Sequence, residues 1–518
     1  MYRRPDLPSG RPLLSRRSFL HGAGAVVGGL TAGSVLAACG EADRSTTASK
    51  KLVFLEPGDV PSGWNRVPSA VNKKLAADTG LTLDIRWIGW SNYSQAELLK
   101  YTSKEKFTGS LEADWLHHAK LAGDGAIFDL DTVWKAKKYP NLVETINERT
   151  IQTSKFGGKL WGVPQVNNAT SLIGFMIRQD LADGEVETFE EFERFLYGVK
   201  QKKSSMIPYG MDNGYINSSL SMFDADSWEG TPEYIGVPVS NIPILLMRTA
   251  DARAGKARVV PIWEVPSKVD TAKRVRKYYT DGILNHDLLN VDKKTIYSLF
   301  GQGKFGAAVG VTDGLMTTTY GGTLNKVPGA RLTLTLPYAD KDAKQLTTFG
   351  ASNHVAFNVE GDQLDDGMRF LEWLSARENH DLLEYGVEGT DWEADDEKSI
   401  TAKSEYVFPG YTMSWRIPLE RRPSDMIESE KRWLDYAQSF DNFELSPLAG
   451  FSLKEQPIKT QLAQFSAMMA RYLRPVQAGS VDVNRGLDAM KKGFSGAGLD
   501  KAVAEVEKQL GAFFAASR

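Results

Sequence analysis

The chain has 518 residues, of which 42% are hydrophobic, 25% charged and 10% aromatic. This length and composition predict a folded protein with two domains or lobes, and they exclude an intrinsically disordered chain. The 62 basic and 65 acidic residues nearly cancel, which excludes a nucleic-acid-binding protein that works through bulk positive charge. Because Cys39 is the single cysteine, an intramolecular disulfide is also excluded.

The N-terminal segment differs in composition from the rest of the chain. Residues 1–38 carry five arginines against one aspartate. Arg16 and Arg17, within Ser-Arg-Arg-Ser-Phe-Leu, form a twin-arginine export signature, and a Gly- and Ala-rich apolar stretch follows over 22–38. That stretch ends in Leu-Ala-Ala-Cys-Gly (36–40), which resembles a lipobox, the motif whose cysteine receives a diacylglycerol. A short membrane helix with an incidental cysteine is the alternative interpretation.

We therefore expect residues 1–39 to be a twin-arginine lipoprotein signal that ends at Cys39, the lipidation site. Residues 40–50 are polar and predict a flexible tether. The protein would then be exported and held by its acyl chains at the outer face of the cell membrane. No later segment of the sequence approaches the roughly 20 apolar residues that a membrane-spanning helix needs.

The body of the chain alternates predicted strands and helices. Residues 51–55 and 81–87 predict two strands, the second with apolar residues at every other position, and a helix is expected between them over 72–79. This order is typical of a parallel α/β unit. Further elements are predicted from apolar periodicity: strands at 307–311 and 355–359, and helices at 364–374, 458–472 and 499–513.

Motifs for catalysis and nucleotide binding are absent from the sequence, including HExxH, CxxC, GxSxG and GxxxxGK[ST]. The glycine-rich run at 301–306 predicts a turn before a strand rather than a phosphate loop. His117 and His118 are adjacent and would diverge on a helix or a strand, so a two-histidine zinc site is not expected. No pair of carboxylates is nominated for glycoside hydrolysis. We expect no enzymatic activity, no cofactor and no metal.

Five segments, in a shared order, resemble the large sugar-binding class of extracellular solute-binding proteins of ABC transporters. The first, FGGKLWGVP at 156–164, is similar to the segment that leads into the first hinge crossing of that class, and YGVEGTDWE is similar to a signature of its lipoprotein branch. The segments are 156–164, 177–192, 300–308, 385–393 and 445–452. The resemblance extends from about Lys51 to the end of the chain.

The resemblance implies an α/β, two-lobed periplasmic-binding-protein-like fold with hinge crossings and extra C-terminal helices. Lobe one would hold 51–165 and 352–380, and lobe two would hold 166–351 and 381–518. It further implies a membrane-anchored extracytoplasmic protein that captures a sugar or oligosaccharide and delivers it to the permease subunits of an ABC importer. We expect it to act as a monomer and to have no nucleic-acid partner.

Members of this class place ligand contacts in loops at the carboxyl ends of strands, as open α/β sheets generally do. Sugar sites combine aromatic plates with paired polar groups. In lobe one and the hinge segment, the implied contacts are Glu56, Trp64, Asp114, His117, Gln165 and Asn168. In lobe two, they are Asp212, Asn213, Trp228, Asp313, Glu388 and Trp392. Trp392 is expected to lie under a sugar ring, and Glu388 to accept hydrogen bonds from sugar hydroxyls.

These residues and the function also have alternative interpretations. Asp114 can serve as a helix cap, Gln165 and Asn168 as turn formers, and the Glu388–Trp392 segment as a structural turn. Most tryptophans in a protein are packing residues. At the level of function, the alternatives are an exported glycosidase and a binding protein for a non-sugar ligand such as a peptide or a metal chelate.

Overall fold

The computed structural model describes residues 49–239, 243–312, 316–338 and 343–516. Cys39, the expected signal, the tether through residue 48, and Asp313 lie outside the described residues. Within the described ranges, no helix is both long and apolar enough to cross a membrane.

The first sheet contains five strands in the order β2-β1-β3-β13-β4. Its central register is parallel, since β1 pairs with both β2 and β3 in that direction, whereas β13 runs antiparallel to β3 and β4. The bounds are β1 (Lys50–Pro57), β2 (Leu81–Ile88), β3 (Gly109–Ala113), β13 (Asn353–Phe357) and β4 (Val163–Gln165). The predicted strands at 51–55 and 81–87 are confirmed.

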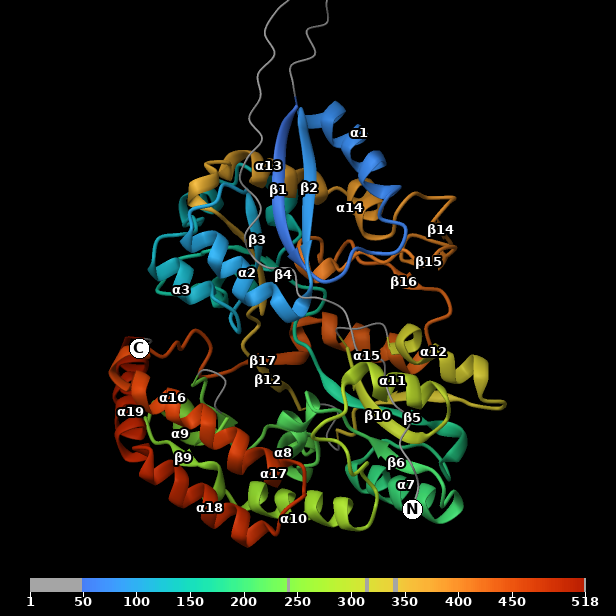
Figure 1. The fold of residues 1–518 in the computed structure, drawn as a ribbon, viewed down its shortest axis with the longest axis vertical. Helices are drawn as coiled ribbons and strands as arrows, with labels where there is room; N and C mark the ends of the chain where they lie inside the picture. Colours follow the sequence, from blue (N-terminus) through green and yellow to red (C-terminus); the bar gives the residue numbers. More distant parts are fainter. Residues whose placement is uncertain (1–48, 240–242, 313–315, 339–342, 517–518) are drawn as a thin grey trace, which may run out of the picture. The chain divides into compact units, whose positions relative to one another are not determined.

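Helices cover both faces of this sheet (Figure 1). Alternate residues of β1, such as Leu52 and Phe54, pack in one hydrophobic core with α1 (Val67–Thr79) and α13 (Leu364–Leu374). The helix α2 (Trp90–Thr102) covers the opposite face. The remaining elements around this core are α3 (His118–Gly123), α4 (Asp131–Lys135), α5 (Pro140–Glu144), α6 (Glu148–Thr153), α14 (Arg377–Glu384), β14 (Trp392–Ala394), β15 (Ser399–Ala402) and β16 (Arg422–Pro423).

A second sheet has the order β11-β5-β10-β6 and a separate hydrophobic core. Its strands are β5 (Ile173–Arg178), β6 (Ile207–Gly210), β10 (Phe305–Val311) and β11 (Leu332–Thr335). The helix α7 (Phe189–Lys202) packs on it through Phe192, whose ring stacks on that of Phe175 with centroids 3.8 Å apart. The smaller elements are α8 (Ser219–Met222), β7 (Tyr234–Gly236), β8 (Leu245–Arg248), α9 (Thr249–Arg253), β9 (Val260–Pro261), α11 (Lys293–Gly301), α12 (Met316–Lys326), β12 (Gln345–Thr347), α15 (Glu428–Gln438) and β17 (Phe443–Leu445).

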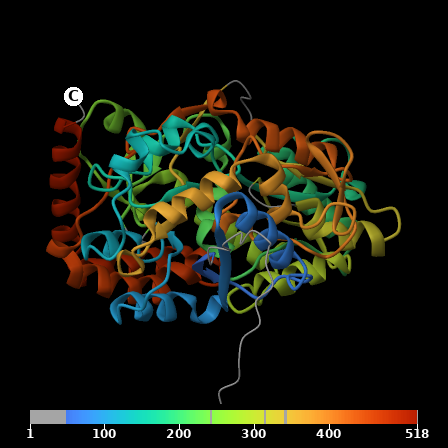
Figure 2. The same ribbon diagram turned by 90° about the horizontal axis from the view of Figure 1, so that it is seen from above.

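The C-terminal helices extend this second core (Figures 1 and 2). They are α16 (Lys459–Met468), α17 (Arg474–Gln477), α18 (Val483–Gly496) and α19 (Leu499–Ala516). Two of them, α17 and α18, lie against α10 (Pro266–Thr280). The predicted helices at 458–472 and 499–513 are confirmed, and the first continues through a π-helical turn over Met469–Leu473. The helix α18 was not predicted from the sequence.

The segment after residue 380 packs differently from the expectation that 381–518 belongs to lobe two. Leu383, Tyr406, Phe408 and Met413 are buried in the first core, with α1 and α13. Trp433 is the next residue along the chain that is buried in the second core. The chain therefore returns to lobe two later than the order of motifs suggested, because its apolar side chains complete the first core before α15.

A buried ionic network holds the 410–421 segment to α14. His380 is fully buried, with Nδ1 3.2 Å from the Asp381 carboxylate and Nε2 3.8 Å from that of Glu420. Arg421 Nε donates to Asp381 at 2.9 Å, and the Ser414 hydroxyl donates to Glu384. Burial opposes the imidazolium charge, but the acidic partners outweigh it and raise the pKa of His380 to about 9. Burial raises the pKa of Glu384 to about 8.

This network predicts that the protein loses stability as the pH rises from 6 to 9. Both folded-state pKa values lie above the unfolded values, near 6.5 for histidine and 4.3 for glutamate, so the folded protein retains protons that the unfolded chain releases. We expect the urea-measured free energy of unfolding to fall by about 1–3 kcal/mol across this interval. His380→Gln should flatten the dependence, whereas His286→Gln, at an exposed position, should not. Equal slopes for the wild type and His380→Gln would contradict this account.

Candidate functional site

The carboxyl ends of three parallel strands meet at one edge of the first sheet. Gly58 follows β1 directly, Trp90 follows β2 by two residues, and Trp115 follows β3 by two residues. Gly58 has φ +117°, and a Cβ at this position would lie 3.8 Å from Trp90 Nε1 and 4.0 Å from the hydroxyl of Tyr411. The 409–416 loop therefore reaches the same edge, which is where open α/β sheets bind ligands.

Aromatic rings gather at this edge and form an aromatic platform, defined as Trp90, Trp115, Tyr411 and Trp415. The centroid of Trp90 lies 6.0 Å from that of Trp115 and 5.9 Å from that of Tyr411, with interplanar angles of 35° and 30°. The rings of Tyr411 and Trp415 meet edge to face at 5.9 Å. Trp90 and Trp115 are 47% and 44% exposed. Because contiguous exposed aromatic surface is unfavourable in water, it marks a place where something binds.

The platform rests on a rigid support. Tyr93 is one turn along α2 from Trp90, and their rings lie 6.0 Å apart. Its buried hydroxyl lies 3.1 Å from the carbonyl oxygen of Leu55 and 2.8 Å from that of Leu111, so it is positioned to donate to β1 and β3. The first turn of α2 is thus tied to both strands, which holds the indole of Trp90 in place.

Glu56 lies beside this platform, near the carboxyl end of β1 and two residues before Gly58. Its side chain is fully buried, and neither carboxyl oxygen has a hydrogen-bond partner among the described residues. Burial raises its pKa well above the ordinary value. A protonated carboxyl group can donate as well as accept, so Glu56 has unused hydrogen-bonding capacity at the strand-end edge.

A cluster of two glutamates and a histidine lies at the same edge, on the face of the sheet that α2 covers. Glu97 and Glu112 are fully buried, and the half-buried His117 lies between them. The Nδ1 atom of His117 is 3.3 Å from Glu97 Oε2, and its backbone N–H donates to Glu112 Oε2 at 3.1 Å. Ser110 Oγ is 3.4 Å from the other oxygen of Glu97. Burial raises the pKa of Glu97 to about 7 and that of Glu112 well above its usual range.

Three of the residues implied for lobe one lie at this edge, and one does not. Glu56 is beside the platform, the exposed Asp114 precedes Trp115, and His117 faces Glu97. Trp64 instead packs inside the lobe, with its ring 5.4 Å from that of Trp87 and stacked on Phe408 at 5.9 Å. Its half-buried indole is therefore a packing residue, which corrects the expectation that it contacts ligand.

Gln165 and Asn168 are buried at the hinge crossing and bond to the protein itself. Gln165 is 2% exposed and accepts from Arg416 Nη1 at 2.7 Å. Asn168 is 6% exposed and donates to the carbonyl of Thr312 at 2.9 Å. Both side chains thus join segments that are distant in sequence, which differs from the turn-forming role of their alternative interpretation.

The candidates in lobe two are also largely used internally. Asp212 is 2% exposed and accepts from the backbone N–H groups of Gly214 and Tyr215. Asn213 is half-buried, and its backbone carbonyl accepts from Arg474. Trp228 is 4% exposed, lies in the second core, and donates from Nε1 to a backbone carbonyl at 2.9 Å. The expected ligand contacts of Asp212 and Trp228 are therefore corrected to structural roles.

The Glu388–Trp392 pair departs most clearly from the expectation. Trp392 is 4% exposed, donates to the carbonyl of Gly386 at 3.0 Å, and packs between Tyr385 and the guanidinium of Arg421. Gly386 has a positive φ of +92°, as the structural turn requires. Glu388 is exposed, as are Gly389 and Thr390 after it. This burial supports the structural-turn alternative and opposes the expectation that the indole of Trp392 lies under a sugar ring.

The aromatic platform itself was missed in the sequence. Trp115 lies between the expected contacts Asp114 and His117 but is not among them, and neither are Trp90, Tyr411 and Trp415. Trp90 carries a usable signal, because it stands two residues after the end of an alternating strand. Tyr411 carries none, since only the tertiary fold brings it beside Trp90.

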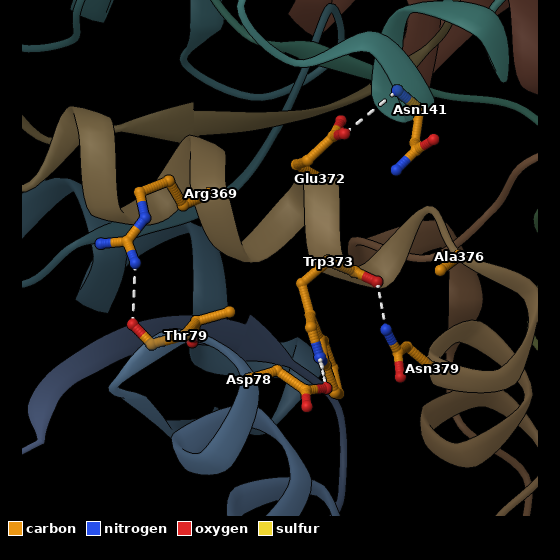
Figure 3. A pocket seen from close by; sticks show the side chains of 8 residues that line it. All are labelled: Asp78, Thr79, Asn141, Arg369, Glu372, Trp373, Ala376 and Asn379. Atoms are coloured by element: carbon orange, nitrogen blue, oxygen red, sulfur yellow. Dashed lines mark hydrogen bonds between the residues drawn. The ribbon is translucent and has the colours of Figure 1, made fainter.

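A cavity of about 370 Å³ lies at the opposite end of this lobe, where the C-terminal end of α1 meets α5, α13 and α14 (Figure 3). The polar groups around it mostly bond to one another. Trp373 Nε1 donates to Asp78 at 2.8 Å, Arg369 donates to the carbonyl of Thr79 at 2.7 Å, and Glu372 accepts from the backbone N–H of Asn141 at 3.1 Å. These bonds join α13 to α1 and to α5, so the cavity is a junction between helices and not the candidate site.

The sequence is similar to known proteins. A family model described as Domain of unknown function (DUF3502) matches residues 447–515. The chain is 24% identical to a carbohydrate ABC transporter substrate-binding protein of Streptococcus pneumoniae serotype 4 (strain ATCC BAA-334 / TIGR4), over 95% of this chain and 97% of that protein.

Solved structures match as well. The N-glycan transport solute binding protein (NgtS) of Streptococcus pneumoniae superposes with a TM-score of 0.74 at 17% identity, covering 90% of this chain and 100% of that one. Its complex with Man5GlcNAc matches with a TM-score of 0.65 at 18% identity, covering 90% and 99%. The alginate-binding protein AlgQ2 matches with a TM-score of 0.62 at 14% identity, covering 90% and 99%.

The chain has a two-lobed periplasmic-binding-protein-like fold. The resemblance inferred from the sequence is confirmed, since the relative in sequence is named as a carbohydrate ABC transporter substrate-binding protein and NgtS as a transport solute binding protein.

The packing of Trp392 predicts that it contributes to stability. Trp392→Ala removes a buried aromatic side chain and should lower the free energy of unfolding by about 3–5 kcal/mol. Trp115→Ala, at a 44% exposed position, should change it by less than about 1 kcal/mol. Denaturant unfolding of the two variants and the wild type measures both effects. A Trp392→Ala protein as stable as Trp115→Ala would return Trp392 to a candidate for ligand contact.

Proposed function

We propose that the protein captures a sugar or oligosaccharide outside the cytoplasm and delivers it to the permease subunits of an ABC importer. The exposed aromatic platform, at the strand-end edge of a lobe in a two-lobed fold, carries this proposal. Support comes from the relative named as a carbohydrate ABC transporter substrate-binding protein and from the neighbour solved with Man5GlcNAc.

The chemistry of the platform suits a carbohydrate. A pyranose ring presents an apolar C–H face to an indole and hydroxyls around its rim, so aromatic plates beside hydrogen-bonding groups match both surfaces. Trp90, Trp115 and Tyr411 offer contiguous plates. Glu56 offers a carboxyl group with no protein partner among the described residues. Such hydrogen bonds are worth roughly 1.5–3 kcal/mol when the acceptor is charged and about half of that when it is neutral.

The enzyme alternative is weaker. A glycosidase holds two carboxyl groups on either side of a bond, about 5–9.5 Å apart. Among the acids at this edge, Glu56, Glu97 and Glu112 are all buried, and the last two enclose His117 instead of flanking an open site. In our proposal the protein binds its sugar without changing it. Prolonged incubation with oligosaccharides would reveal hydrolysis by chromatography.

The platform predicts which residues sugar affinity depends on. Trp90→Ala and Trp115→Ala should each weaken binding by about 5- to 30-fold, because stacking of a sugar on an aromatic ring is worth about 1–2 kcal/mol. Leu99→Ala, an exposed apolar position (66%) on the same helix α2, is the matched control and should bind normally. Calorimetry against mono- and oligosaccharides, including Man5GlcNAc, measures the affinities. A sugar that binds both tryptophan variants as tightly as the wild type would refute the platform, and binding of peptides alone would favour the non-sugar alternative.

Our proposal also includes a monomer anchored at the outer face of the membrane through lipidated Cys39. The twin arginines and the lipobox-like sequence support it. We expect Cys39→Ala to move the protein from the membrane fraction to the soluble one, because no acyl chain is then attached. Arg16→Lys with Arg17→Lys should block export, whereas Arg3→Lys with Arg4→Lys should not. Full retention of the Cys39→Ala protein in the membrane fraction would refute lipid anchoring.

A further inference from the structure

A cluster of potential metal ligands lies at the strand-end edge, and sugar binding does not account for it. Glu97 comes from α2, Glu112 from β3, and His117 from the turn before α3. Each offers one ligand atom, and these three atoms lie within 4.8 Å of one another. We propose that Glu97, Glu112 and His117 form a site for a divalent transition-metal cation, with Zn²⁺ as the best fit.

The spacing between the ligand atoms of His117 and Glu97 suits such an ion. Nδ1 of His117 lies 3.3 Å from Oε2 of Glu97, and a tetrahedral site with bonds of about 2.0–2.1 Å separates its ligands by roughly 3.3 Å. The other ring nitrogen of His117 lies 3.3 Å from the hydroxyl of Ser94. A hydrogen bond of this kind is what fixes the tautomer and orientation of a metal-bound histidine.

The charges also call for a cation. Glu97 and Glu112 are both 0% exposed, and within the described ranges no lysine or arginine forms an ion pair with either carboxylate. The one ionic partner is His117, at Glu97. Two buried carboxyl groups without a cation are costly unless they hold a proton. A divalent ion would balance both charges at once.

Unused polar atoms beside the cluster are an independent indication. Oε1 of Glu112 is buried and has no hydrogen-bond partner among the described residues. His354 lies directly opposite Glu112 in the β3–β13 pair, and opposed residues of antiparallel strands point to the same face. His354 is 3% exposed, stacks on His118 at 4.5 Å, and neither of its ring nitrogens has a hydrogen-bond partner in the part of the chain that the structure describes. The cluster thus has a free oxygen and an adjacent free imidazole.

The ligand set selects the kind of metal. Ca²⁺ and Mg²⁺ prefer sites built wholly from oxygen ligands, whereas imidazole suits zinc and its neighbours. Two carboxylates with one imidazole leave a coordination position for water or another ligand, as zinc sites with three protein ligands do. We therefore expect Zn²⁺ to bind more tightly than Mn²⁺, and Ca²⁺ to bind least.

The test is metal binding to the full-length mature protein without sugar, so its result is independent of the proposed function. After dialysis against EDTA, calorimetry and thermal melting are measured with ZnCl₂, MnCl₂ and CaCl₂. We expect one equivalent of Zn²⁺ to bind and to raise the melting temperature in a concentration-dependent way.

Variants locate the site. His117→Ala, and Glu97→Gln with Glu112→Gln, should weaken Zn²⁺ binding at least tenfold, whereas His286→Ala, at an exposed histidine, should bind as the wild type does. The glutamine variant removes the buried charges and keeps their shape, so it remains informative if His117→Ala folds poorly. Absence of stoichiometric Zn²⁺ binding to the wild type, or equal binding by the glutamine variant, would overturn the proposal.

Discussion

The parallel register of β1 with β2 and β3 is the constraint on which the rest of the first lobe depends. It aligns Phe54 with Ile85 and Gly109, and so brings three carboxyl strand ends to one edge. A shift of β3 by one residue would send Ser110 and Glu112 to the opposite face of the sheet, away from α2. The aromatic platform and the buried acids exist together only because this register holds.

Two features of the same edge lower the stability of the folded protein. Two tryptophans are left nearly half exposed, although each could gain stability by burial. Three glutamates are fully buried without a lysine or arginine partner among the described residues, although desolvation penalises their charge. Proteins retain destabilising features of this kind mainly at functional sites. Exposed tryptophans and buried glutamates at one strand-end edge therefore indicate a binding site.

Local patterns in the sequence predicted the local structure, and tertiary contacts decided the rest. The alternation at 81–87 predicted β2, and apolar stripes predicted α13 and α19. The helix α18 was not predicted because its glycines lower helix propensity. Gly486 is nevertheless required there, since a Cβ at this position would lie 2.6 Å from the side chain of Val476. Trp392 was chosen by motif and proved buried, whereas Trp90 gains its partner Tyr411 from a loop 321 residues away. Burial and long-range neighbours of this kind are not encoded in any short window.

The platform and the acid cluster are joined through one short turn. Trp115 stands between Glu112 and His117, whose backbone N–H already bonds to the Glu112 carboxylate. Any interaction that tightens Glu112 against His117 therefore also restricts the turn that carries the indole. A binding site that is ordered before its ligand arrives loses less conformational entropy on association, and its affinity rises accordingly. The buried acids thus restrict the motion of the Trp115 ring through the four residues that connect Glu112 to His117. They need no direct contact with the ligand to do so.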